Sequence, residues 1–137
     1  MVEPVTLREM EFSSIPENIN LIEALVEELK ADLDLSEEAE ANILVSLSEA
    51  VNNAILHGNQ ANPEKKVKII IEKLEKEMIF SIEDQGDGFD ETTIKDPTAI
   101  ENIDKPTGRG IFLMRNLSDR MEFFDGGKKV VITFLRS

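Results

Sequence analysis

The spacing of apolar residues along the chain predicts two helices in its first half. Apolar positions recur at steps of three and four residues through residues 16–31, and Pro16 suits the first turn of a helix. A second helix is expected from Ser36 to His57, followed by Gly58 as a left-handed cap. We expect the core stripe of this second helix to comprise Leu44, Leu47, Val51 and Ile55.

Runs rich in β-branched and other apolar residues predict five strands and a mostly antiparallel sheet. The order is strand, helix, helix, hairpin, long connection, helix and hairpin, which places the helices on one face of the sheet. The fold class is therefore α+β, a two-layer α/β sandwich, in a single domain of residues 1–137. The expected strands are residues 5–12, 66–74, 78–83, 120–124 and 129–135.

Composition narrows the classes of function. The net charge of -13 and the scattering of 15 Lys and Arg residues argue against a direct nucleic-acid partner. No stretch of eighteen apolar residues and no signal peptide is visible, so we expect a cytoplasmic protein without a membrane partner. The absence of Cys excludes disulfides, and a single His argues against a zinc site.

The second predicted helix carries a polar face with candidate chemistry. Glu49 and Asn53 lie four residues apart, so a carboxylate and an amide share one side of the helix. The carboxylate can act as a base, and the amide oxygen can ligate Mg²⁺ beside phosphate groups. The alternative is an ordinary solvated helix face.

A glycine-rich turn directly follows the second strand of the first predicted hairpin, residues 78–83. Asp84 lies where a strand ends, and Gly86 and Gly88 after it allow a ligand to approach the backbone closely. A carboxylate here can accept a hydrogen bond from the adenine N6 amine. The alternative is a simple polar turn. A calcium loop is excluded because its twelfth position would be Ile94.

The connection of residues 89–107 contains few apolar residues, and we expect a lid there, at about residues 90–110. Residues 107–110, Thr-Gly-Arg-Gly, are expected to form a loop before the third helix, whose free amides attract phosphate. Arg109 or Lys105 can add positive charge at the terminal phosphate. Ordinary loop chemistry remains the alternative, and no P-loop pattern is present.

Three motifs in this order resemble the GHKL ATP-binding superfamily of gyrases, heat-shock chaperones, histidine kinases and MutL. They are residues 49–53 (Glu-Ala-Val-Asn-Asn), residues 84–88 (Asp-Gln-Gly-Asp-Gly) and residues 108–110 (Gly-Arg-Gly). In so short a chain, the extended motifs look most like the bacterial anti-sigma factor serine kinases, the RsbW and SpoIIAB group. The resemblance implies the Bergerat, histidine-kinase-like ATPase fold.

The resemblance also implies roles for single residues. Glu49 would be the general base, Asn53 would hold Mg²⁺, and Asp84 would bind adenine. Gly86 and Gly88 would line the pocket. Gly108 and Gly110 would let the lid fold over the phosphates, and Thr107 and the neighbouring amides would donate hydrogen bonds to them. Thr133 would support the adenine end of the pocket. His57 is interpreted first as a helix C-terminal residue favoured by the dipole.

By this resemblance the ligands are ATP or ADP with Mg²⁺. The implied activity is transfer of the γ-phosphate to a serine of a small anti-sigma factor antagonist, and the implied second partner is a sigma factor that the protein sequesters. A homodimer is typical of the group. Pro106 stands where some kinase members carry a basic lid residue. The alternative function is a non-catalytic regulator whose protein binding is gated by ATP.

Overall fold

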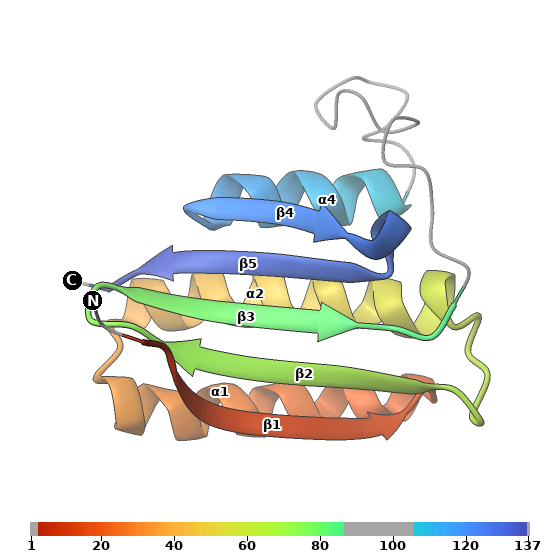
Figure 1. Cartoon of the computed structure of the whole chain (residues 1–137), viewed down its shortest axis with the longest axis horizontal. Helices are drawn as coiled ribbons and strands as arrows, with labels where there is room; N and C mark the ends of the chain where they lie inside the picture. Colours follow the sequence, from red (N-terminus) through yellow and green to blue (C-terminus); the bar gives the residue numbers. More distant parts are fainter. Residues whose placement is uncertain (1–2, 87–105, 137) are drawn as a thin grey trace.

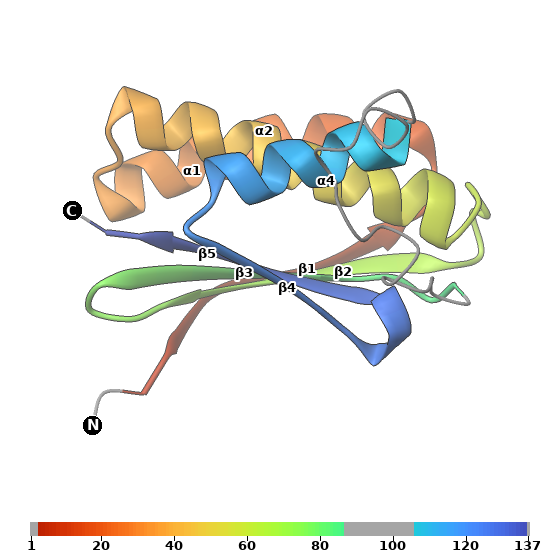
Figure 2. The ribbon, with the colours of Figure 1, turned by 90° about the horizontal axis from the view of Figure 1, so that it is seen from above.

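The computed structural model describes residues 3–86 and 106–136, in which a five-stranded antiparallel sheet carries helices on one face (Figures 1 and 2). The strand order is β1-β2-β3-β5-β4, and every neighbouring pair is antiparallel. This arrangement confirms the predicted α+β class and two-layer sandwich. The strands are β1 (Val5–Ser13), β2 (Lys66–Lys73), β3 (Glu77–Glu83), β4 (Arg120–Phe124) and β5 (Lys129–Leu135).

The helices form a single layer, with α2 between α1 and α4 (Figure 2). Helix α2 begins next to Ser36, as predicted, and Ser36 caps its N-terminus because its hydroxyl accepts a hydrogen bond from the amide of Ala39 at 3.1 Å. None of the helices described is long and apolar enough to span a bilayer. Their bounds are η1 (Pro16–Asn20), α1 (Leu21–Leu33), α2 (Glu37–Asn53), η2 (Ala54–Gly58), α4 (Pro106–Leu117) and η4 (Asp125–Gly127).

The core lies between the sheet and the helical layer. Alternate residues of the three central strands face the helices, and Phe80 of β3 meets Phe134 of β5 edge to face at a centroid distance of 5.7 Å. Each fully buried large aliphatic side chain contributes roughly 1.5–3 kcal/mol to stability. The helices supply buried residues at steps of three and four, among them Ile22, Leu25, Leu29, Leu47, Val51, Ile55, Ile111 and Met114.

Two details of the first helices differ from the prediction. Residues 16–20 form a 3-10 turn before α1, and α1 continues to Leu33, where Asp34 takes a left-handed conformation with φ of 52°. In α2, Ile43 is fully buried, whereas Leu44 is only partly buried against the core. The hydrophobic stripe is thus wider than the predicted one, as is usual for a helix that packs on both a sheet and other helices.

The predicted left-handed cap at Gly58 is wrong. Helix α2 passes into the π-helical turn η2, and the left-handed residues that follow are Gln60 and Ala61, with φ of 54° and 55°. Among the described glycines, positive φ occurs at Gly126 and Gly127. Gly58 is required for a different reason, a close approach described below.

The predicted loop at residues 107–110 is also wrong in part. Helix α4 begins at Pro106, so these four residues lie in its first turns. Proline is favoured at this position because its fixed φ matches a helix and its missing N–H has no partner there. The preceding part of the expected lid, residues 90–105, lies outside the described residues.

Candidate functional site

The first part of the site is the polar face of α2 where α4 packs against it. Glu49 and Asn53 are both half-buried on this face. A Cβ atom placed on Gly110 of α4 would lie 2.7 Å from Glu49 Oε2 and 3.3 Å from Asn53 Nδ2. The structure therefore brings together the carboxylate, the amide and the glycine that the sequence singled out.

Neighbouring residues of α4 hold this helix against the core. Ile111 and Met114 are both 1% exposed and lie one and four residues after Gly110. They fix α4 by burial, and the missing side chain at Gly110 lets the two helices meet beside Glu49. The carboxylate and the amide therefore lie at the contact between α2 and α4, and both are partly exposed.

The second part of the site is Asp84, directly after β3. Its amide donates to the carbonyl oxygen of Lys128 at 2.9 Å, and its Oδ1 accepts from the amide of Gly86 at 2.9 Å. Burial raises the pKa of the Asp84 carboxyl, although the Gly86 hydrogen bond and the charge of Lys128 act in the opposite direction. Within the described residues, no hydrogen bond to the other oxygen of this carboxylate is formed. A half-buried carboxylate with a spare acceptor suits a ligand amine.

Two glycines allow the end of α2 to touch the Asp84 turn. A Cβ on Gly58 would overlap the Asp84 carboxylate, and even its farther oxygen, Oδ1, would be only 2.8 Å away. A Cβ on Gly86 would overlap the carbonyl oxygen of Gly58. Gly58 follows Asn53 by five residues, a rise of about 7 Å along a helix. One continuous helix thus carries the amide and reaches the carboxylate.

Asn59 is a residue of the site region that the sequence did not single out. It is 1% exposed, and its side chain forms three hydrogen bonds, two of them to Ser14 and Gln85, which are distant in the sequence, and one to the nearby Lys66. An Asn after a helix is normally interpreted as a turn former, and the sequence contains no signal of its burial. The sequence predicts Gly58 as a cap, although a glycine between two polar motifs is also a signal for close backbone approach.

Other predicted site residues fall elsewhere or outside the description. Gly88 and Lys105 lie outside the described residues, and the backbone of Thr107, Gly108 and Arg109 lies in the first turns of α4. His57 is exposed in η2, near the helix C-terminus as expected.

Thr133 is not brought to the Asp84 turn. It pairs with Ile79, five residues before Asp84 along β3, which corresponds to about 17 Å. Its strand neighbours Ile132 and Phe134 face the core, so alternation places Thr133 on the opposite face of the sheet, where it is nevertheless buried, with 3% exposed.

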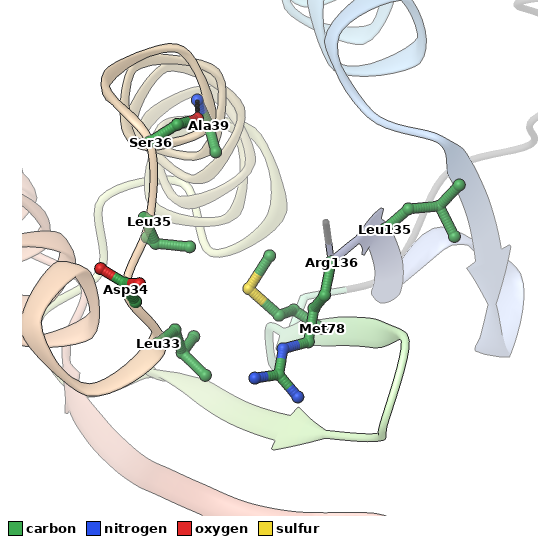
Figure 3. A pocket seen from close by; sticks show the side chains of 8 residues that line it. All are labelled: Leu33, Asp34, Leu35, Ser36, Ala39, Met78, Leu135 and Arg136. Atoms are coloured by element: carbon green, nitrogen blue, oxygen red, sulfur yellow. Dashed lines mark hydrogen bonds between the residues drawn. The ribbon is translucent and has the colours of Figure 1, made fainter.

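A pocket at the other end of the molecule is separate from this site (Figure 3). It lies where α1 turns into α2 and where β3 begins. The guanidinium of Arg136 in its wall donates to the carbonyl oxygens of Leu74 and Glu75. Met78 in the same wall precedes Asp84 by six strand residues, or about 20 Å.

The residues present fit an adenine nucleotide with a metal ion. Asp84 offers an acceptor for the purine amine, and Asn53 offers one oxygen ligand for Mg²⁺. Residues 3–86 and 106–136 contain no group of three or more acidic or His side chains arranged to hold a metal. A magnesium ion here would therefore take most of its ligands from phosphate and water, as Mg²⁺ commonly does.

Comparison with known proteins agrees with this geometry. The histidine kinase-like ATPase domain family matches residues 12–134. The anti-sigma F factor of Bacillus cytotoxicus is 32% identical over 116 residues, covering 82% of this chain and 79% of the relative. The anti-sigma F factor of Clostridium perfringens (strain 13 / Type A) is 30% identical over 129 residues, covering 90% and 91%. The chain belongs to the histidine kinase-like ATPase (GHKL) domain family and is a distant homologue of anti-sigma F factors.

Proposed function

We propose that this protein is an ATP-dependent serine kinase that also acts as an anti-sigma factor. The observation that carries the proposal is the meeting of Glu49 and Asn53 beside Gly110, in a chain of an ATP-binding family. The glycine lets α4 pack closely on α2 at Glu49 and Asn53, so the N-terminal turns of α4 lie beside the carboxylate and the amide. In an ATP-binding family, this juxtaposition supports a phosphate site at these side chains.

Each residue has a definite task in this proposal. Asp84 accepts a hydrogen bond from the adenine N6 amine, and Asn53 contributes an oxygen ligand to Mg²⁺. The bound metal neutralises charge on the phosphates. Residues 107–110, in the first turns of α4, lie near a helix N-terminus, where backbone amides attract phosphate oxygens.

Glu49 is the base of the proposed reaction. The serine oxygen of the acceptor protein bonds to the γ-phosphorus of ATP as the bond from that phosphorus to the β-phosphate oxygen breaks. ADP leaves, and the serine proton passes to the Glu49 carboxylate. Most of the acceleration in such a transfer comes from positioning and from neutralisation of charge.

The proposed partners follow from the relatives, which are anti-sigma F factors by name. This chain would sequester a sigma factor and phosphorylate a small antagonist protein on serine.

We further propose that it works in the cytoplasm, as a single ATP-binding domain with a lid at about residues 90–110, and that it assembles as a homodimer. A pull-down from the source cell with and without Mg-ATP identifies both partners.

Phosphoryl transfer is tested with ATP labelled at the γ-phosphate and the antagonist recovered in that pull-down. The wild-type protein is expected to label the antagonist on serine. Glu49→Gln should lose at least about a hundredfold in rate, the scale of general-base catalysis, while it still binds Mg-ATP. Glu38→Gln is the matched control, since Glu38 is exposed in the first turn of α2.

The outcomes separate the two candidate functions. Unchanged transfer by Glu49→Gln removes Glu49 from the mechanism. If the wild type binds ATP and releases a partner on nucleotide exchange, but moves no phosphate to the recovered antagonist, the protein is the non-catalytic ATP-gated regulator instead.

A further inference from the structure

We infer that Asn59 is a positioning residue that sets the Asp84 carboxylate for recognition of the purine amine. The inference rests on the proposed adenine site and adds a residue that determines its specificity. Asn59 does not touch the ligand in this account. It acts through Gln85, the residue next to Asp84.

The hydrogen bonds of Asn59 tie three segments together. Its Oδ1 accepts from the backbone amide of Gln85 at 2.7 Å. Its Nδ2 donates to the hydroxyl of Ser14, at 2.6 Å, and to the carbonyl oxygen of Lys66, at 3.0 Å. The end of α2, the end of β1 and the start of β2 therefore converge on the turn that carries Asp84.

The position of Asn59 itself is fixed by the π-helical turn. Its amide donates to the carbonyl oxygen of Ala54 at 2.8 Å, and its side chain is 1% exposed. Ser14, its acceptor, is fully buried. A buried amide with both ends hydrogen-bonded has one allowed orientation, because a rotation that exchanges oxygen and nitrogen would leave donors facing donors.

A second hydrogen bond holds the same turn from the other side. The side-chain Oε1 of Gln85 accepts from the amide of Lys66 at 2.7 Å. Gln85 is thus anchored through its backbone to Asn59 and through its side chain to Lys66. These two anchors hold the neighbouring Asp84 so that its Oδ1 accepts a hydrogen bond from the Gly86 amide. Its other carboxylate oxygen remains available to accept a hydrogen bond from the purine amine.

The consequence concerns purine selectivity. Adenine presents an amine at C6 and hypoxanthine presents a carbonyl, which a carboxylate at this point repels. A site built to hydrogen-bond one group rejects the analogue that lacks it, provided the acceptor is held in place. Loosening of the Asp84 turn should therefore weaken ATP binding more than ITP binding.

The test compares binding of Mg-ATP, Mg-ADP and Mg-ITP to purified wild type and variants by calorimetry. Asn59→Ala should bind ATP roughly tenfold more weakly, the change expected when one hydrogen bond to a buried group is lost. Its preference for ATP over ITP should shrink, while the ratio of ATP to ADP affinity stays as in the wild type. Asn62→Ala is the matched control, since within residues 3–86 and 106–136 the Asn62 side chain accepts only from the Glu64 amide in the same loop.

A second pair of variants keeps the inference testable if Asn59→Ala does not fold. Ser14→Ala removes one acceptor of Asn59, and Gln85→Ala removes the bond to Lys66. Both variants should also reduce the preference for ATP over ITP, but each by less than Asn59→Ala does. Folding of each variant is checked by thermal unfolding.

Two results are distinguishable. If the wild type prefers ATP and these variants keep the full preference, the role of Asn59 is contradicted and the proposed function stands. If the folded wild type binds no adenine nucleotide, the proposed function fails, and this inference fails with it.

Discussion

At the scale of single residues, the site depends on three glycines, positions at which a side chain would not fit. Gly58, Gly86 and Gly110 each stand where a Cβ atom would meet a group of the site. None of the three needs a left-handed backbone, so their value is close approach rather than conformational freedom. The sequence marks all three as glycines near polar motifs, but it does not reveal which atoms they approach.

Gly58→Ala should weaken ATP binding strongly, because the new methyl group displaces the Asp84 carboxylate. We expect a loss of at least about tenfold in affinity for Mg-ATP, measured by calorimetry. Gly126→Ala serves as the control: its backbone φ of 67° disfavours alanine, but nothing lies within 4 Å of the added Cβ. The control should be less stable yet bind ATP as the wild type does. Full ATP affinity in Gly58→Ala would contradict the close approach.

The raised pKa of Asp84 predicts a pH dependence of stability. The native state binds this proton more tightly than the unfolded state, whose pKa is about 3.9. The carboxyl therefore favours the folded state most below pH 3.9, and this contribution is lost as the pH rises through the native pKa. Asp84→Asn should accordingly be more stable than the wild type at pH 7, with a gap in melting temperature that narrows toward pH 4. A difference in melting temperature that widens as the pH falls would contradict a raised pKa of Asp84 in the native state.

At the scale of elements, periodicity is enough to predict the five strands and the helical layer. Three of the ten strand ends differ from the predicted ones by one residue and the other seven coincide, because alternating burial in β2, β3 and β5 follows the sequence closely. The π-helical turn η2 does not follow from periodicity, and it ends at Gly58, which closely approaches Asp84, a residue far away in the sequence. The start of α4 does have a local signal, since proline is favoured in the first turn of a helix, but the glycines at positions 108 and 110 favour a loop there.

The crossing of α2 and α4 yields a prediction at Gly110. Alanine is the better helix former by about 1 kcal/mol, so Gly110→Ala should not destabilise α4 itself. Its methyl group would however lie 2.7 Å from Glu49 Oε2, and the carboxylate must move away. We expect phosphoryl transfer to fall roughly tenfold or more while the melting temperature changes little. An unchanged rate of phosphoryl transfer would show that the function of Glu49 does not depend on the absence of a side chain at Gly110.

At the scale of the whole molecule, charge is distributed unevenly. Helices α1 and α2 each carry four acidic residues, and together they contain one Lys and no other basic residue. With a net charge of -13, the protein repels a free nucleotide at long range. Binding must therefore be organised locally, by the short-range contacts of Asp84, Asn53 and the backbone of α4.

This repulsion predicts the salt dependence of nucleotide association. Raising the ionic strength from about 0.01 M to 0.15 M shortens the screening length from roughly 30 Å to 8 Å. The association rate of a fluorescent ATP analogue, measured by stopped flow, should rise over this range. A rate that falls with salt would indicate an attractive local field that outweighs the acidic surface.

The central claim is that the turn after β3 and the polar face of α2 together form one site for an adenine nucleotide with magnesium. Titration calorimetry of the folded wild-type protein with Mg-ATP tests it most directly. We predict saturable binding that is weaker for Mg-ITP and lost in Asp84→Ala. Folded protein that takes up no Mg-ATP, or that binds ATP and ITP equally, would contradict the account.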